Sequence, residues 1–296
     1  RMILARDEAK RQVAIGYQWS FSTTIQALKK AILSDRFGLP RRLKSLCLWP
    51  RNASYYARNR WAGRKQDPES GAWILDSPVN NAMAHYLHNM LFLLGPSIRQ
   101  SAEPVQIEAE LFRANPIENY DTAALRVQTR EGVEILFFGA HPIEENRGPV
   151  FSFEFEHAVV SCADQGAVVE VRFHDGTRES FPHPDADDQC TKLWVCMKAV
   201  LDDTPFPCSL EAARAQTLCM NGAQESMPDA LSFPTSMLRR TGHPESALTW
   251  VEGLAEALES GWKHAKLLSE EGVSWAKPGK AVDLVGFNRF PSNLNR

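Results

Sequence analysis

The sequence predicts an α+β fold: a large, open, mostly antiparallel sheet with helices on one face, preceded by the last βα piece of a doubly wound α/β domain. Three observations lead to this prediction. Between residues 105 and 181, apolar residues alternate with polar ones, which is the period of a half-buried strand. Amphipathic helical patterns flank that region on both sides. A short apolar run that ends in a glycine, Val13–Gly16, lies near the start and is typical of a buried parallel strand.

The composition and charge narrow the possible functions. The 296 residues are 44% hydrophobic and 23% charged, which is ordinary for a globular protein. The net charge of −3 disfavours a nucleic-acid partner. The longest apolar run near the start is too short to span a bilayer and no signal-peptide pattern is present, so we expect no membrane partner. The six cysteines include no CxxC pair, which favours reduced thiols and a cytoplasmic location.

The first part of the chain predicts helix and strand in alternation. Residues 6–11 are compatible with a brief helix, and residues 13–17 follow as the buried strand. Residues 22–33 carry an amphipathic pattern that Gly38-Leu39-Pro40 stops. Residues 43–49 then read as another strand.

A loop and a helix come next. Residues 51–71 form a stretch of about 20 residues without a clear element, and loops of that length are usually functional or disordered. Its aromatic residues argue against disorder. Residues 81–94 predict a helix, because their apolar residues form one stripe and Gly95-Pro96 closes it.

The alternating region predicts at least five or six antiparallel strands. Two-residue turns at Glu131-Gly132 and Asp175-Gly176 predict hairpins within it. One apolar face of this sheet must be covered by helices or by another subunit. Helical patterns return after Pro184, at residues 193–201, 210–218 and about 246–268.

Polar residues are densest just before and inside the predicted helix 81–94. They are Asp76, Ser77, Asn80, Asn81, His85, His88 and Asn89. Positions three and four apart share a helix face, so His85 lies beside both Asn81 and His88. A histidine can remove the hydroxyl proton of a secondary alcohol while hydride leaves the same carbon. Capping of the helix by Asn80 or Asn81 is the structural alternative.

Two further patterns bear on the chemistry. His85, His88 and Asp76 could together bind a metal ion, as in a hydrolase, although no HExxH motif supports that reading. The chain also contains no GxGxxG and no P-loop. It therefore lacks the usual means of holding a dinucleotide pyrophosphate.

The order of these segments resembles the Gfo/Idh/MocA family, named for glucose–fructose oxidoreductase, inositol dehydrogenase and rhizopine catabolism. Val13–Gln18, followed by Phe21, resembles the last Rossmann strand of that family and its turn. Arg58–Gly63 resembles a loop on the substrate side. Leu75–Pro78, continuing to His85 and Gly95, resembles the helix that carries the catalytic aspartate and histidine. The likeness covers most of residues 13–220.

One position departs from the family pattern, which is an aspartate followed four positions later by a histidine. His85 matches the histidine, but Asn81 stands at the aspartate position. Because an asparagine cannot accept a proton as a base, His85 would carry the acid–base work more nearly alone. By the resemblance, a Glu-Lys-Pro lysine and a glycine-rich cofactor loop would lie upstream of Arg1.

The resemblance implies reversible hydride transfer between NAD or NADP and a hydroxyl-bearing carbon of a sugar, inositol or related polyol. It implies catalytic roles for His85 and Asn81, and no metal. The residues implied to bind substrate are Arg58, Asn59, Trp61, Asp76 and Asn80, and those implied to approach the cofactor are Tyr17 and Gln18. A non-catalytic binding or assembly module of the same fold is the alternative, suggested by Asn81 and by the missing lysine.

The sequence also predicts a division of the chain. Residues 1–20 would be a remnant of the nucleotide-binding domain, residues 21–234 the substrate and oligomerisation domain, and residues 235–296 a helical extension packed on it. Copies would pair through the open face of the sheet, and this portion alone would be inactive. All of this depends on the imidazole of His85 facing a cavity. A ring sealed in apolar packing, or one turned to bulk solvent, would remove the dehydrogenase interpretation.

Overall fold

The computed structural model describes residues 1–292. The helices are α1 Met2–Ala9, α2 Thr23–Leu33, α3 Ala53–Ala57, α4 Ala84–Leu93, α5 Thr191–Leu201, α6 Leu210–Ser226 and α7 Leu254–His264. The strands are β1 Pro40–Leu48, β2 Pro104–Arg113, β3 Thr122–Thr129, β4 Glu134–Ala140, β5 Arg147–Phe155, β6 Ala158–Cys162, β7 Val169–Phe173, β8 Arg178–Phe181, β9 Leu231–Ser232, β10 Leu238–Thr241, β11 Leu248–Val251 and β12 Val282–Asp283. The predicted α+β class is confirmed.

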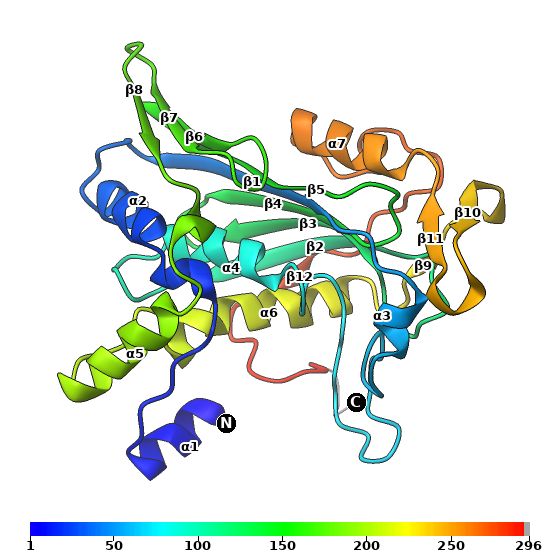
Figure 1. Cartoon of the computed structure of the whole chain (residues 1–296), viewed down its shortest axis with the longest axis horizontal. Coiled ribbons are helices and arrows are strands. Elements are labelled where there is room, and N and C mark those ends of the chain that lie inside the picture. The colour runs from blue at the N-terminus through cyan, green and yellow to red at the C-terminus, as the bar shows by residue number, and fades with distance from the viewer. Residues whose placement is uncertain (293–296) are drawn as a thin grey trace.

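One large sheet of ten strands dominates the molecule (Figure 1). Its order is β12-β2-β3-β4-β1-β5-β6-β7-β8, with β9 paired to β2. Most neighbours are antiparallel, as predicted, but β1 runs parallel to β4 and antiparallel to β5. Leu43 of β1 therefore pairs with Ile135 on one side and with Phe153 on the other. The hairpins predicted at residues 131–132 and 175–176 join β3 to β4 and β7 to β8.

Helices cover both faces of this sheet. α2, α4 and α6 pack on one face, where the alternate strand residues Leu125, Val127 and Phe137 join the larger core. The intervening residues Leu136 and Phe138 point to the other face and pack against α7 and the segment after it. Figure 1 shows α6 below the sheet and α7 above it. The second helical layer lies in the C-terminal extension, so the extension buries apolar surface that helices on one face would leave open.

The predicted strand at residues 13–17 is wrong. These residues run as an irregular segment with a single isolated bridge between Ala14 and Ser209. The Ile15 N–H donates to the Cys208 carbonyl at 2.9 Å. A parallel strand needs neighbouring strands in its sheet, and within residues 1–292 no strand lies beside this segment. The helix predicted just before it does form, as α1.

Two helices begin later than predicted. α4 begins at Ala84, because residues 78–83 form turns in which the side-chain amide of Asn80 donates to the Ile74 and Leu75 carbonyls instead of capping a helix. α7 begins at Leu254 after Gly253, whose φ of 77° a residue with a side chain rarely adopts. Residues 248–251, predicted to be helical, form β11 instead.

A membrane-spanning helix was not expected. Among residues 1–292, every helix falls short of the length and apolarity needed to cross a bilayer.

Candidate active site

A buried carboxylate, Asp76, organises the turn before α4. Its Oδ2 accepts the Gly63 N–H at 2.6 Å, and its Oδ1 accepts the Asn81 side-chain amide at 2.8 Å. Burial raises the pKa of Asp76, and these two donated hydrogen bonds oppose the rise. Gly63 has a φ of 70°, and a Cβ there would lie 2.7 Å from Ile117, so only glycine fits this approach. Asp76 thus ties the loop at residue 63 to Asn81.

The loop residues implied to bind substrate lie close to this carboxylate. The Arg58 guanidinium stacks 3.5 Å from the centre of the Tyr55 ring and 4.9 Å from that of Trp61. The hydroxyl of Tyr55 lies 3.3 Å from the side-chain amide of Asn81. The structure therefore gathers Arg58, Trp61, Asp76 and Asn81 into one neighbourhood, although they are up to 23 positions apart in sequence.

Two of the residues implied to bind substrate are engaged by their own loop. The side-chain oxygen of Asn59 accepts the N–H groups of Trp61 and Ala62, at 3.1 and 2.8 Å. The Asn80 amide bonds two backbone carbonyls, as described above. Both asparagines hold the backbone in its turns, so their polar groups are less free for a ligand than those of Arg58.

His85 lies on the first turn of α4 and is half-buried. Its ring contacts that of Tyr17 nearly at a right angle, with the ring centres 5.4 Å apart. Its Nδ1 is buried and, in the described chain, makes no hydrogen bond. Burial lowers the pKa of His85, the charge of Lys192 lowers it further, and Asp185 opposes both. These influences favour the neutral form of the ring, which can accept a proton. The ring is partly exposed but is not among the residues that line the polar cavity beside α4, so its opening into a cavity stays a prediction.

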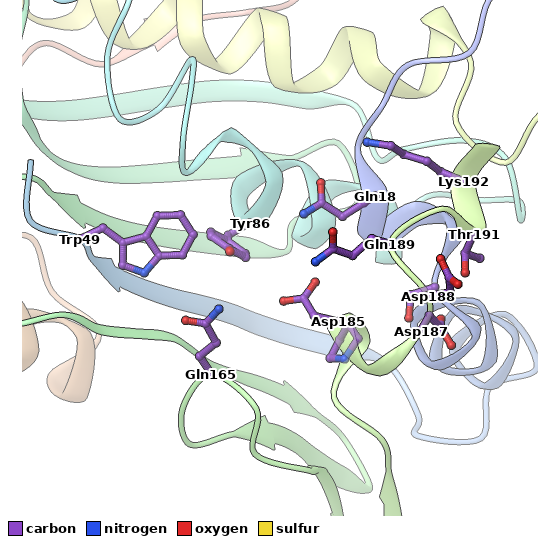
Figure 2. Close-up of a pocket in the computed structure, with 12 residues that line it drawn as sticks. Gln18, Trp49, Tyr86, Gln165, Asp185, Asp187, Asp188, Gln189, Thr191 and Lys192 are labelled. Atoms are coloured by element: carbon purple, nitrogen blue, oxygen red, sulfur yellow. The ribbon is translucent and has the colours of Figure 1, made fainter. Parts of the chain in front are cut away.

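A polar cavity of about 430 Å³ opens beside α4 (Figure 2). Its lining comes from five separate parts of the chain. The lining residues are Gln18, Ser22, Trp49, Tyr86, Gln165, Pro184, Asp185, Asp187, Asp188, Gln189, Thr191 and Lys192. Figure 2 shows Tyr86 and Trp49 on one side of the space, and the segment from Asp185 to Lys192 on the other. The two charged residues that influence the pKa of His85, Asp185 and Lys192, both belong to this lining.

The two residues implied to approach the cofactor, Tyr17 and Gln18, point into different surroundings. Gln18 lines the polar cavity. Tyr17 stacks on His88 with ring centres 4.0 Å apart, and its hydroxyl donates to Gln216 at 3.0 Å. Tyr17 also lines a different groove of about 700 Å³, formed mainly by α1, α6 and residues 287–289. Tyr17 and Gln18 therefore lie between the polar cavity and this groove.

His88 is part of the core. Its Nε2 lies 2.9 Å from the Ser20 hydroxyl and 3.6 Å from the Cys208 sulfur, and burial lowers its pKa to about 3. Within residues 1–292, no three His, Cys, Asp or Glu side chains are grouped so that they could hold a metal ion. The metal site read from Asp76, His85 and His88 is therefore wrong, because the three side chains face different surroundings.

Sequence reasoning missed most of the cavity lining. Trp49 directly follows β1, Tyr86 is next to His85, and the run Asp185–Gln189 precedes α5. The available signal was that acidic run, which lies between a proline and an amphipathic helix. Nothing in the linear pattern indicates that it returns to α4, about 100 positions earlier.

Comparisons with known proteins find solved structures that share this architecture. No protein-family model and no curated protein matches the sequence. The WlbA dehydrogenase of Bordetella pertussis, solved with NADH and UDP-GlcNAcA, superposes with a TM-score of 0.58 at 21% identity, over 77% of this chain and 66% of that one. The UDP-N-acetylglucosamine 3-dehydrogenase GnnA of Acidithiobacillus ferrooxidans gives 0.56 at 18% identity, over 74% and 62%.

An aldose–aldose oxidoreductase from Caulobacter crescentus, solved with glycerol, gives a TM-score of 0.57 at 17% identity, over 76% of this chain and 65% of that one. The chain has the fold of the C-terminal domain of Gfo/Idh/MocA enzymes. At these identities the Gfo/Idh/MocA likeness shows the fold alone. The matched part spans 62–66% of these three solved chains.

Proposed function

We propose that this chain is the substrate-facing part of an NAD(P)-dependent dehydrogenase that oxidises or forms a hydroxyl on a sugar or polyol. One observation carries the proposal: half-buried His85, whose Nδ1 makes no hydrogen bond in the described chain, directly precedes Tyr86, which lines the polar cavity. The chemistry of His85 fits the removal of a hydroxyl proton. The solved neighbours supply the cofactor class, since one was solved with NADH.

Each residue has a role in this proposal. His85 takes the hydroxyl proton in the oxidation and returns it in the reverse direction. Asn81 orients the substrate hydroxyl through an amide that Asp76 fixes at 2.8 Å. Arg58 and Trp61 present a cation and a flat apolar ring to the substrate from the adjoining loop.

The cofactor would supply the site that accepts or gives the hydride. Tyr17 and Gln18 fit its approach, because the Tyr17 ring contacts that of His85 and Gln18 lines the cavity. The chain contains no glycine-rich loop, so these residues do not suffice to hold the phosphates of NAD or NADP.

The experiment measures NAD(P)H absorbance for the full-length gene product with a panel of sugars and polyols. We expect turnover that His85→Ala lowers by about 10²–10⁴-fold, the usual contribution of a general base. His243→Ala, at an exposed histidine, should leave turnover unchanged and serves as the control. Absence of both turnover and cofactor binding in the full-length product would refute the proposal.

A non-catalytic binding module of the same fold is the second candidate. It is favoured by Asn81, which stands where the family has an aspartate and cannot act as a base. If His85→Ala leaves the full-length product unchanged, or if Asn81→Asp creates activity that was absent before, this second reading holds.

Three wider expectations also remain proposals. We place the protein in the cytoplasm, because all six cysteines are free thiols. We retain the division at residues 20/21 and 234/235. We also retain pairing of copies through the open face of the sheet. Gel filtration with light scattering tests the pairing.

A further inference from the structure

The polar cavity beside α4 has an unbalanced charge. Three carboxylates line it, those of Asp185, Asp187 and Asp188, against one ammonium group, that of Lys192. The lining therefore carries a net charge of −2, from three negative charges and one positive. We propose that this cavity selects an uncharged polyhydroxylated ring, a free sugar or cyclic polyol, over sugar acids and nucleotide-diphosphate sugars. The inference rests on the proposed function and names its substrate class.

The carboxylates are held in place before any ligand arrives. Asp185 accepts the indole N–H of Trp19 at 2.6 Å. Asp187 accepts the Thr23 N–H and hydroxyl at 2.7 and 2.9 Å. Because they are fixed by these bonds, an anionic ligand cannot displace them by a simple side-chain rotation, and the repulsion persists.

The cavity also offers what an uncharged ring needs. Trp49 and Tyr86 meet edge to face with ring centres 5.5 Å apart, and the indole N–H of Trp49 is anchored on the Gly148 carbonyl at 3.1 Å. Such aromatic walls pack against the C–H face of a sugar, and a few placed polar groups fix its orientation. These two aromatic side chains can pack against the ring of a charged or an uncharged sugar. They therefore favour binding of a sugar ring, and the carboxylates supply the discrimination by charge.

Amide side chains supply the matching hydrogen bonds. Gln18, Gln165 and Gln189 line the cavity, and in the described chain their side-chain amides form no hydrogen bond. Each amide can donate and accept, as can each hydroxyl of a sugar. Three free amides together with fixed carboxylates suit a ring rich in hydroxyl groups.

Two arginines of the adjoining loop lie outside the lining and are not part of this charge balance. Arg51 and Arg58 both stack on Tyr55, at 4.9 and 3.5 Å, and neither lines the cavity. In contrast, the WlbA dehydrogenase of Bordetella pertussis was solved with UDP-GlcNAcA, a ligand that carries a diphosphate. The charge of this cavity therefore predicts a preference different from the ligand of that neighbour.

The test is a saturation-transfer NMR titration of the 296-residue protein without cofactor. The probes are D-glucose, myo-inositol, D-glucuronate and UDP-N-acetylglucosamine, at low and high salt. We expect a neutral probe to bind at least about tenfold more tightly than D-glucuronate at low salt, and the ratio to shrink as salt screens the carboxylates.

Two matched variants locate the effect. Asp185→Asn keeps an acceptor for the Trp19 indole and should narrow the glucose-to-glucuronate ratio by about threefold or more. Asp175→Asn, at the exposed β7–β8 turn, also keeps its acceptor for a backbone N–H and should change nothing. If Asp185→Asn fails to fold by circular dichroism, Asp188→Asn replaces it, because Asp188 only caps the Cys190 N–H.

Equal binding of glucose and glucuronate, binding of none of the four probes, or a ratio that the cavity variants leave unchanged would overturn the inference. Charge selectivity without NAD(P)H turnover in the full-length product would refute the dehydrogenase and leave the selectivity standing. Turnover in the full-length product together with equal binding of neutral and anionic sugars would refute the selectivity and leave the dehydrogenase proposal standing.

Discussion

Helices α4 and α7 pack on opposite faces of the same sheet, and they are built differently. α7 buries one stripe, formed by Leu254, Leu258 and Gly261. α4 is buried on almost every side and takes polar groups into the interior with it. Three of its buried polar atoms make no hydrogen bond in the described chain, those being His85 Nδ1, His88 Nδ1 and Asn89 Oδ1. Unpaired buried polar atoms lower stability, so the three in α4 set this helix apart from α7, where the buried residues are apolar or glycine.

The largest expected effect is on the α7 side. Leu258 is fully buried against the sheet, so Leu258→Ala removes apolar contacts and leaves a void. We expect the free energy of unfolding to fall by about 3 kcal/mol. Urea denaturation measures this, with the exposed Glu256→Ala as the control in the same helix. A loss below about 1 kcal/mol would show that the packing of α7 against the sheet contributes little to stability, contrary to the contrast drawn with α4.

On the α4 side, the next largest effect is expected at Lys29. This fully buried lysine of α2 donates to the carbonyls of Phe92 and Gln100, at the end of α4 and just after it. Lys29→Met keeps most of the volume but leaves both carbonyls without a donor, so we expect a loss of about 2 kcal/mol. Thermal unfolding tests it, with the exposed Lys30→Met as the control. An unchanged melting temperature would show that water replaces the ammonium group.

The third prediction concerns the loss of folding stability at low pH. Burial lowers the pKa of His88 to about 3 in the folded protein, while the unfolded chain keeps a histidine near its ordinary value of 6.5. The unfolded state therefore takes up a proton first as the pH falls, and stability is lost from about pH 6.5 down toward pH 3.

For His88, this loss amounts to about 1.4 kcal/mol per pH unit. We expect His88→Leu to reduce the pH dependence of unfolding by that amount between pH 6 and pH 4, as measured by denaturation at each pH. His243→Leu, at an exposed histidine outside both helices, serves as the control. Parallel curves for the wild type and His88→Leu would contradict the assigned burial.

The smallest effect is expected at α5, where most of the large apolar side chains are exposed. Trp194 is 57% exposed and Leu201 83% exposed. Trp194→Gln should change the free energy of unfolding by less than about 0.5 kcal/mol, because it removes little buried area. A larger loss, measured by the same urea titration, would place α5 with α7 as a packing helix.

Local sequence patterns correctly predicted those strands and turns whose conformation depends on residues close in sequence. The period-two strands and the turns at residues 131–132 and 175–176 formed where expected, since twist, turn and alternation are set within about ten residues. The spacing also predicted that His85 lies on a helix, as it does in α4, while its catalytic role stays a prediction. Long-range placement was not predictable, because nothing near Asp185 in sequence indicates that it faces Tyr86.

The errors at element boundaries have similar causes. Residues 13–17 have strand-like composition, but a strand exists only with a partner in its sheet. Asn80 resembles a helix cap, yet its amide finds two carbonyls behind it and delays the helix to Ala84. In both places a tertiary contact overrides a local preference.

The position of β1 has a consequence for how the chain folds. β1 is completed at residue 48, yet both of its neighbours, β4 and β5, begin only at residues 134 and 147. The middle of the sheet therefore cannot close until residues 134–155 have been synthesised, and until then both edges of β1 are unpaired. Closing loops of that length is slow, so refolding should be slow and sensitive to protein concentration, with aggregation competing until β5 arrives.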